Sequence, residues 1–86
     1  MISMADTGQV NDLIREIMDD RGVPRNIKAS LEESMSILDG SDSEEEKIAS
    51  IISILDDASG DPNISFHTRT KIWNMVSVLE SLKREL

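Results

Sequence analysis

The stretch IMDDRGVPRNI occupies residues 17–27, and a looser copy of it, ILDDASGDPNI, occupies residues 54–64. Both copies place two large apolar residues before a pair of aspartates, and Gly, Pro, Asn and Ile follow in that order. The offset is 37 residues at the aspartate pairs and 38 at the Gly and Pro positions. A period in this range is typical of a helix–turn–helix unit in helical repeat proteins. The repeat therefore predicts two similar helical hairpins, each with one copy at its turn.

Apolar residues recur at helical spacing on both sides of each turn. They predict four helices, near residues 7–20, 24–38, 44–58 and 65–85, and no alternating strand pattern occurs. Because three short loops join these helices, consecutive helices should pack antiparallel. We therefore predict an all-α fold, an antiparallel four-helix bundle made of two similar helical hairpins, in a single domain spanning residues 1–86.

The expected helix ends follow from local chemistry. Gly22 stands where a left-handed residue would end the first helix, and Pro24 suits the first turn of the second. Ser43 and Glu46 predict a reciprocal capping box on the third helix. For the fourth helix, Asn63 and Ser65 are both candidate caps.

The helical faces also predict the core. Trp73, at the margin of its apolar arc, should be partly covered. The residues expected to be largely buried are Leu13, Ile17, Ile27, Leu31, Ile48, Ile52, Leu55, Ile72, Val76 and Leu79.

Charge is unevenly distributed along the chain. The net charge is −8, yet residues 39–61 hold eight acids and one base, whereas residues 64–86 hold four bases and two acids. Overall acidity disfavours non-specific nucleic-acid binding, which depends on a basic surface. The first ten residues lack a signal-peptide pattern and no apolar run is long enough to span a bilayer, so we expect a cytoplasmic protein.

No pattern of catalytic or metal-binding residues stands out. The chain has no cysteine and a single histidine, His67, so a metal site would have to be built around it from carboxylates alone. The acidic stretch from Asp39 fails as a calcium loop, because Glu44 stands where Gly is required and Ser50 where Glu is required. We expect no enzyme activity, no cofactor and no metal.

The third and fourth helices have unusually broad apolar arcs, about 220–240° against about 120° for the first helix. Their outer positions are Ile54, Val78 and Leu82. These two helices could be the central pair of the bundle, or the excess could face a second chain in a homodimer. Both accounts stay open at this point.

Cations gather at two expected helix N-termini, where they oppose the helix dipole. Arg25 and Lys28 begin the second helix, and Arg69 and Lys71 lie near the start of the fourth. One account is a network of ion pairs that ties the two turns together. The acids available for it are Asp19, Asp20, Asp56, Asp57 and Asp61. The other account is a charged docking surface.

Four stretches carry a resemblance to a known family: residues 23–28, 61–64, 67–70 and 72–74. Together they resemble an uncharacterised archaeal family of small acidic proteins, over nearly the whole chain. The chain departs from the family pattern at Ser65, where Pro is usual, and at Thr68, where Ala is usual. The resemblance implies an archaeal cytoplasmic protein with an all-helical bundle, and it transfers no catalytic residue.

The leading hypothesis is a non-enzymatic protein–protein interaction module, self-associating through Ile54, Val78 and Leu82. The alternative is an accessory factor that docks on a ribonucleoprotein through Arg25, Lys28, Arg69 and Lys71. A small enzyme or metal protein ranks third.

Overall fold

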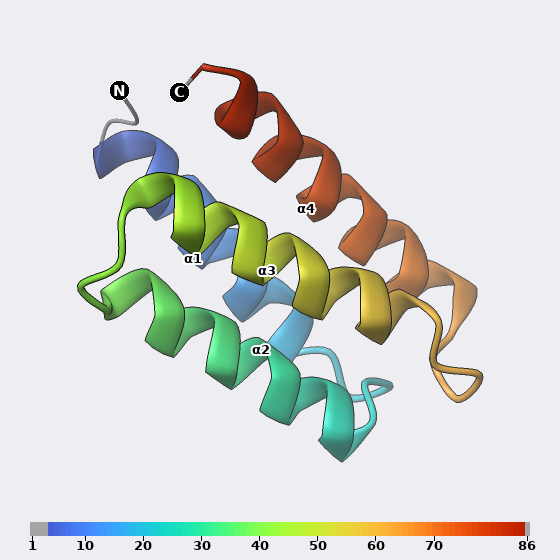
Figure 1. The fold of residues 1–86 in the computed structure, drawn as a ribbon. Helices are drawn as coiled ribbons and strands as arrows, with labels where there is room; N and C mark the ends of the chain where they lie inside the picture. The colour runs from blue at the N-terminus through green and yellow to red at the C-terminus, as the bar shows by residue number, and fades with distance from the viewer. Residues whose placement is uncertain (1–3, 86) are drawn as a thin grey trace.

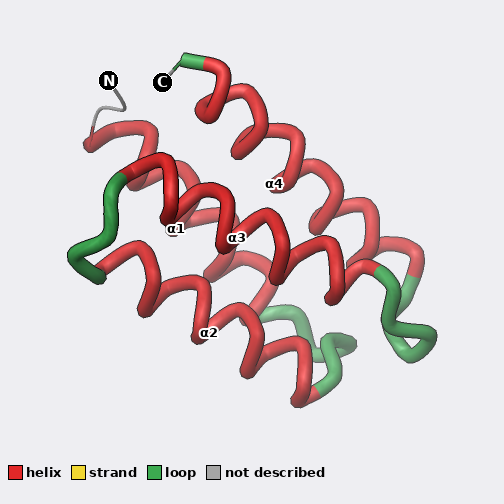
Figure 2. Tube along the Cα trace, in the orientation of Figure 1, coloured by secondary structure: helices red, strands yellow, loops and turns green. Residues whose placement is uncertain are grey.

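The computed structural model describes residues 4–85, with side chains from residue 8 onward. It contains four helices: α1 (Met4–Met18), α2 (Arg25–Asp39), α3 (Glu44–Ser59) and α4 (Phe66–Arg84). Figure 1 shows the four helices side by side, and the described residues contain no strand (Figure 2). The all-helical prediction with four helices is confirmed. Only α1 departs by more than one residue from the expected ends.

Serine side chains cap two of the helices. The Ser43 hydroxyl accepts a hydrogen bond from Glu46 N at 3.2 Å at the start of α3, and the Ser65 hydroxyl accepts one from Thr68 N at 3.1 Å at the start of α4. The reciprocal half of the predicted capping box, from the Glu46 carboxylate to Ser43 N, does not form among the described residues. Of the two candidate N-caps of α4, Ser65 and not Asn63 is the cap.

The predicted left-handed glycine at the end of α1 is wrong. No glycine in the described residues has a positive φ. Instead, Gly22 N donates to the Asp20 carboxylate at 2.9 Å, so a side-chain turn ends the helix. Pro24 precedes α2 as its N-cap, with φ −60° and ψ 154°, one residue outside the helix that it was expected to begin.

The helices contact one another around a ring. α3 packs against α2 and α4, α1 packs against α2 and α4, and the most extensive contact joins α3 to α4. The molecule measures 35 × 20 × 20 Å. None of the helices in the described range is long and apolar enough to cross a membrane.

The core runs along the inner faces of all four helices. Seven of the ten residues expected there are buried, and Leu13, Ile52 and Val76 are only half-buried. In each of these three cases an adjacent residue is fully buried. Those adjacent residues are Ile14, Ile51 and Met75. On an arc that carries two consecutive apolar residues, periodicity alone does not say which of them points to the centre.

Candidate functional site

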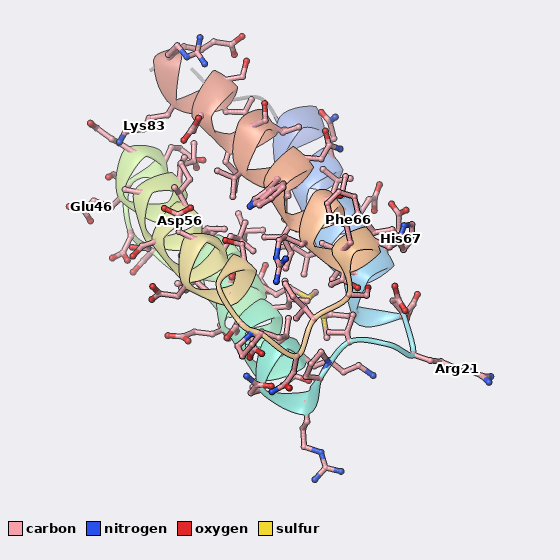
Figure 3. All side chains as sticks on the ribbon, turned by 90° about the vertical axis from the view of Figure 1, so that its right-hand side faces the viewer. Arg21, Glu46, Asp56, Phe66, His67 and Lys83 are labelled. Carbon is pink, nitrogen blue, oxygen red and sulfur yellow. The ribbon has the colours of Figure 1, made fainter. Side chains whose placement is uncertain are left out.

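Both aromatic residues of the chain lie on the outside of the molecule. Phe66 is 74% exposed and Trp73 is 51% exposed, so Trp73 is partly covered, in keeping with the expectation for it. The two residues are seven positions apart on α4, which is two helical turns, so they share one face. Figure 3 shows Phe66 and His67 together on the first turn of α4.

This face of α4 is exposed along its whole length. Its residues follow helical spacing and are all classed as exposed: Phe66, Thr70, Trp73, Ser77, Glu80 and Arg84. We call these six residues the outer row of α4. The opposite side of the same helix carries Ile72, Met75 and Leu79, which are at most 1% exposed. The outer row is therefore the solvent-exposed face of a helix whose opposite face is buried in the core.

The residues predicted for self-association lie elsewhere. Ile54 and Val78 are half-buried, and Val78 packs against the core. Leu82 is 8% exposed and belongs to the core itself, so its assignment as an outer position is wrong. The reason is its spacing: Leu82 follows Met75 by seven residues and Leu79 by three, which places it on the inward side of α4.

The four predicted docking cations do not form one cluster. The Arg69 guanidinium lies over the α3–α4 turn, where it donates to Ser59 O at 3.0 Å and to Asp61 O at 3.3 Å. Lys71 Nζ lies 3.6 Å from Glu16 Oε1, which joins α4 to α1. Arg25 is exposed and Lys28 is half-buried on the first turns of α2.

The predicted ion-pair network between the two turns is also wrong. Within residues 8–85, the Lys71–Glu16 pair is the one salt bridge, and none involves the aspartates of the turns. The tie between the turns is a hydrogen bond instead: Asn26 Nδ2 donates to Asp61 Oδ2 at 2.6 Å. Of the nearby cations, Arg69 donates to backbone carbonyls, those of Ser59 and Asp61, rather than to the Asp61 carboxylate.

Asp61 accepts a second hydrogen bond, from Asn63 N to Oδ1 at 2.8 Å. The bond from Asn26, with the backbone bond from Asn63 second, holds the pKa of the Asp61 carboxyl below its ordinary value. Bonds to the ionised form favour that form. Asp61 is thus a charged acceptor that fixes both the α3–α4 turn and the start of α2.

One apolar notch opens where all four helices contribute. Its volume is about 10 Å³, room for roughly one water molecule. The residues around it are Val10, Leu38, Glu44, Lys47, Ile48, Leu79 and Leu82. Small-molecule sites measure about 300–1,000 Å³, so this notch is too small for a substrate.

The sequence matches a known family along nearly all of its length. The profile described as "Uncharacterised protein family (UPF0147)" matches residues 4–82. The chain belongs to this family. A UPF0147 protein of Methanothermobacter thermautotrophicus is 47% identical over 76 residues, covering 87% of this chain and 74% of the relative. One from Archaeoglobus fulgidus is 40% identical over 87 residues, covering 99% of this chain and all of the relative.

Two solved structures have the same fold. A crystal structure of a protein of unknown function superposes with a TM-score of 0.85 at 37% identity, covering 94% of each chain. A UPF0147 protein of Thermoplasma acidophilum also gives a TM-score of 0.85, at 30% identity, covering 92% of this chain and 94% of that one. The resemblance found in the sequence is therefore confirmed. UPF0147 membership fixes the fold and assigns no activity to any residue.

Sequence reasoning missed the outer row of this UPF0147 chain. It followed the apolar arcs, which lead to Ile54, Val78 and Leu82, and it gave Phe66 no role. The available signal was different. The only two aromatic residues stand seven apart, on the face of α4 opposite Ile72 and Met75. Aromatic residues are common among the residues that dominate binding energy at interfaces, so this pair makes the outer row a candidate contact surface.

Proposed function

We propose that this protein is a non-enzymatic protein–protein interaction module that contacts its partner through the outer row of α4. The observation that carries the proposal is the exposure of Phe66 and Trp73. Aromatic residues, Trp above all, are enriched among the residues that dominate binding energy at protein interfaces. A small domain that places both of its aromatics outside its core keeps its largest apolar side chains for contact with another molecule.

The scaffold for this surface is, in our interpretation, an antiparallel four-helix bundle made of two similar hairpins. Contacts join each pair of consecutive helices, α1 with α2, α2 with α3 and α3 with α4, as expected when consecutive helices form hairpins. The Asn26–Asp61 hydrogen bond supports the placement of both hairpin turns at one end. In Figure 1, α1 and α3 run in one direction and α2 and α4 in the other. Such a bundle holds α4 rigid while leaving its outer face open.

The ribonucleoprotein alternative has less support. Arg69 is occupied by two backbone carbonyls and Lys71 lies beside Glu16, which leaves Arg25 and Lys28 from the four predicted cations. Two cations on a chain of net charge −8 make a weak footprint for RNA, since affinity for nucleic acid rests on several phosphate contacts.

Site-specific photo-crosslinking tests the proposal. A photoreactive phenylalanine analogue is placed at position 73 or at position 66, and matched controls carry it at Ser53 of α3 or Ser36 of α2, which are also exposed. Each protein is irradiated in extract of its source cells. We expect discrete protein adducts from positions 66 and 73 well above those from the controls. Equal, diffuse labelling from all four positions would refute the proposed contact surface.

A further inference from the structure

The residues of the outer row of α4 are spaced in the same way from the N-terminal end as from the C-terminal end. Successive members of the row are 4, 3, 4, 3 and 4 residues apart, from Phe66 to Arg84. A 4-and-3 alternation is common to every face of an α-helix, the seam of a coiled coil included. Because the series reads the same in both directions, the row fits in register against an antiparallel copy of itself.

We propose that the partner of this face is a second copy of the chain, bound antiparallel about a two-fold axis between the two α4 helices. This inference rests on the proposed function and names the partner. In this register, residue 66 faces the partner's residue 84, residue 70 faces residue 80 and residue 73 faces residue 77, so that facing residue numbers sum to 150. A two-fold contact uses the same patch on both chains, so no second specific surface is required.

Each pair in this register is matched in size and chemistry. Trp73 faces the partner's Ser77, so the bulkiest side chain of the row meets one of the smallest. Phe66 faces the partner's Arg84, where a guanidinium over the ring makes a cation–π contact. Thr70 faces the methylene stem of the partner's Glu80. Both aromatic side chains lie in the first half of the row, and the second half carries a serine and two charged residues, so an antiparallel pairing keeps the aromatic residues of the two chains from facing each other.

Charge and area agree with this geometry. Residues 64–86 carry +2, from four bases and two acids, whereas the rest of the chain carries −10 within the net −8. An α4–α4 contact therefore joins the least acidic parts of two chains that otherwise repel each other. The row covers about 27 Å of helix. A credible interface of about 1,000 Å² in total would take roughly a tenth of the 5333 Å² surface of each copy.

Sedimentation equilibrium from low to high micromolar concentration tests the dimer. The expected species has twice the chain mass of 9.6 kDa. Trp73→Ser and Phe66→Ser should each raise the dissociation constant at least tenfold with unchanged helical circular dichroism. Matched changes at exposed sites on other helices, Ser53→Ala and Ser36→Ala, should leave it unchanged. A monomer at every concentration would overturn the inference.

Engineered disulfides test the direction and register, because the chain has no cysteine of its own. Thr70→Cys and Glu80→Cys proteins are oxidised separately and as a mixture. In the proposed register the 70–80 pair is adjacent, whereas 70–70 and 80–80 pairs lie about 15 Å apart along the axis, beyond disulfide reach. We expect a disulfide only in the mixture. Rapid cross-linking of either variant alone, as a parallel pair would give, or none in the mixture, would contradict the arrangement.

The two proposals fail differently. A monomeric protein whose position 73 still cross-links specifically to another protein would end the self-association and leave the interaction module standing. A monomer with no specific adduct from positions 66 and 73 would end both.

Discussion

Asp61 shows how one side chain can join distant parts of a small chain. It accepts hydrogen bonds from Asn26, 35 residues away, and from Asn63 in its own turn. The repeated stretch predicted both turns from the sequence, but it did not predict the hydrogen bond that joins them. The charges near the turns suggested ion pairs, whereas the donor in the structure is the Asn26 amide. The sequence could not predict this, because composition does not say in which direction a side chain points.

Removal of the Asn26 amide should raise the pKa of Asp61 toward its ordinary value of 3.8. Since the folded pKa lies below that value, the stability contributed by Asp61 is complete above about pH 3.8 and is lost as the pH falls through the folded pKa. NMR titration of the Asp61 carboxyl in the wild type and in Asn26→Ala measures the shift. Identical titration curves would show that the bond does not operate in solution.

The side chains of Ser65 and Thr68 are hydrogen-bonded to each other at the start of α4. The Ser65 hydroxyl accepts from Thr68 N and donates to Thr68 Oγ1 at 3.0 Å, and the Thr68 side chain is fully buried. These are also the two positions at which the resemblance implied a departure from the family pattern, and in this chain their side chains are in direct contact.

Ser65→Ala should cost about 2 kcal/mol, about half from the lost cap and half from the buried threonine hydroxyl left without its donor. Ser65→Ala with Thr68→Ala should therefore cost less than the sum of the two single changes. Urea unfolding of the four proteins gives the comparison. Strict additivity would mean that the two hydroxyls are not coupled.

Helix α3 shows what the spacing of apolar residues can predict, which is where a helix lies, and what it cannot, which is the face that is buried. Its bounds were predicted to within one residue, because the Ser43 cap and the acidic first turn mark its start. Its buried face was one residue off: Ile51 and Leu55 are fully buried, whereas Ile52 is half-buried. Packing against α2 and α4 together sets the rotation of the helix, and no single segment contains that information.

Alanine substitutions along α3 measure this rotation. Ile51→Ala and Leu55→Ala should each cost about 2–5 kcal/mol, the range for large buried aliphatic side chains. Ile52→Ala should cost clearly less, because its side chain already reaches solvent. Chemical denaturation followed by circular dichroism supplies the values. A larger loss at Ile52 than at Ile51 would place the inward face of α3 elsewhere.

The last turn of α3 carries Asp56 and Asp57, both exposed, and no base. Acids at a helix C-terminus oppose the dipole, and neither residue pairs with a cation of residues 8–85. Asp56→Lys and Asp57→Lys should therefore leave stability unchanged or raise it slightly. Thermal melts at low salt are the suitable measurement, with Ser53→Lys as a control for added charge. A clear loss of stability would restore the ion-pair account.

At the scale of the whole molecule, the repeat, the caps and the apolar spacing were enough to predict four helices and no sheet. They were not enough to identify the surface that is left over once the helices pack. Leu82 was taken for an outer residue because its arc was interpreted on an isolated helix, whereas α1 and α3 pack against α4 and Leu82 belongs to the core. Phe66 and Trp73 lie on the face of α4 that stays exposed once its neighbouring helices are in place.

The fluorescence emission of Trp73 reports directly on the pairing of two α4 helices, because Trp73 is the one tryptophan of the chain and lies in the middle of the outer row. At high dilution we expect the spectrum of a half-exposed indole. We also expect a shift to shorter wavelength as the concentration rises, with the same midpoint as the change in mass, and no such shift in Arg84→Glu. An emission spectrum that stays the same across the concentration range would contradict the pairing of α4 with a second copy.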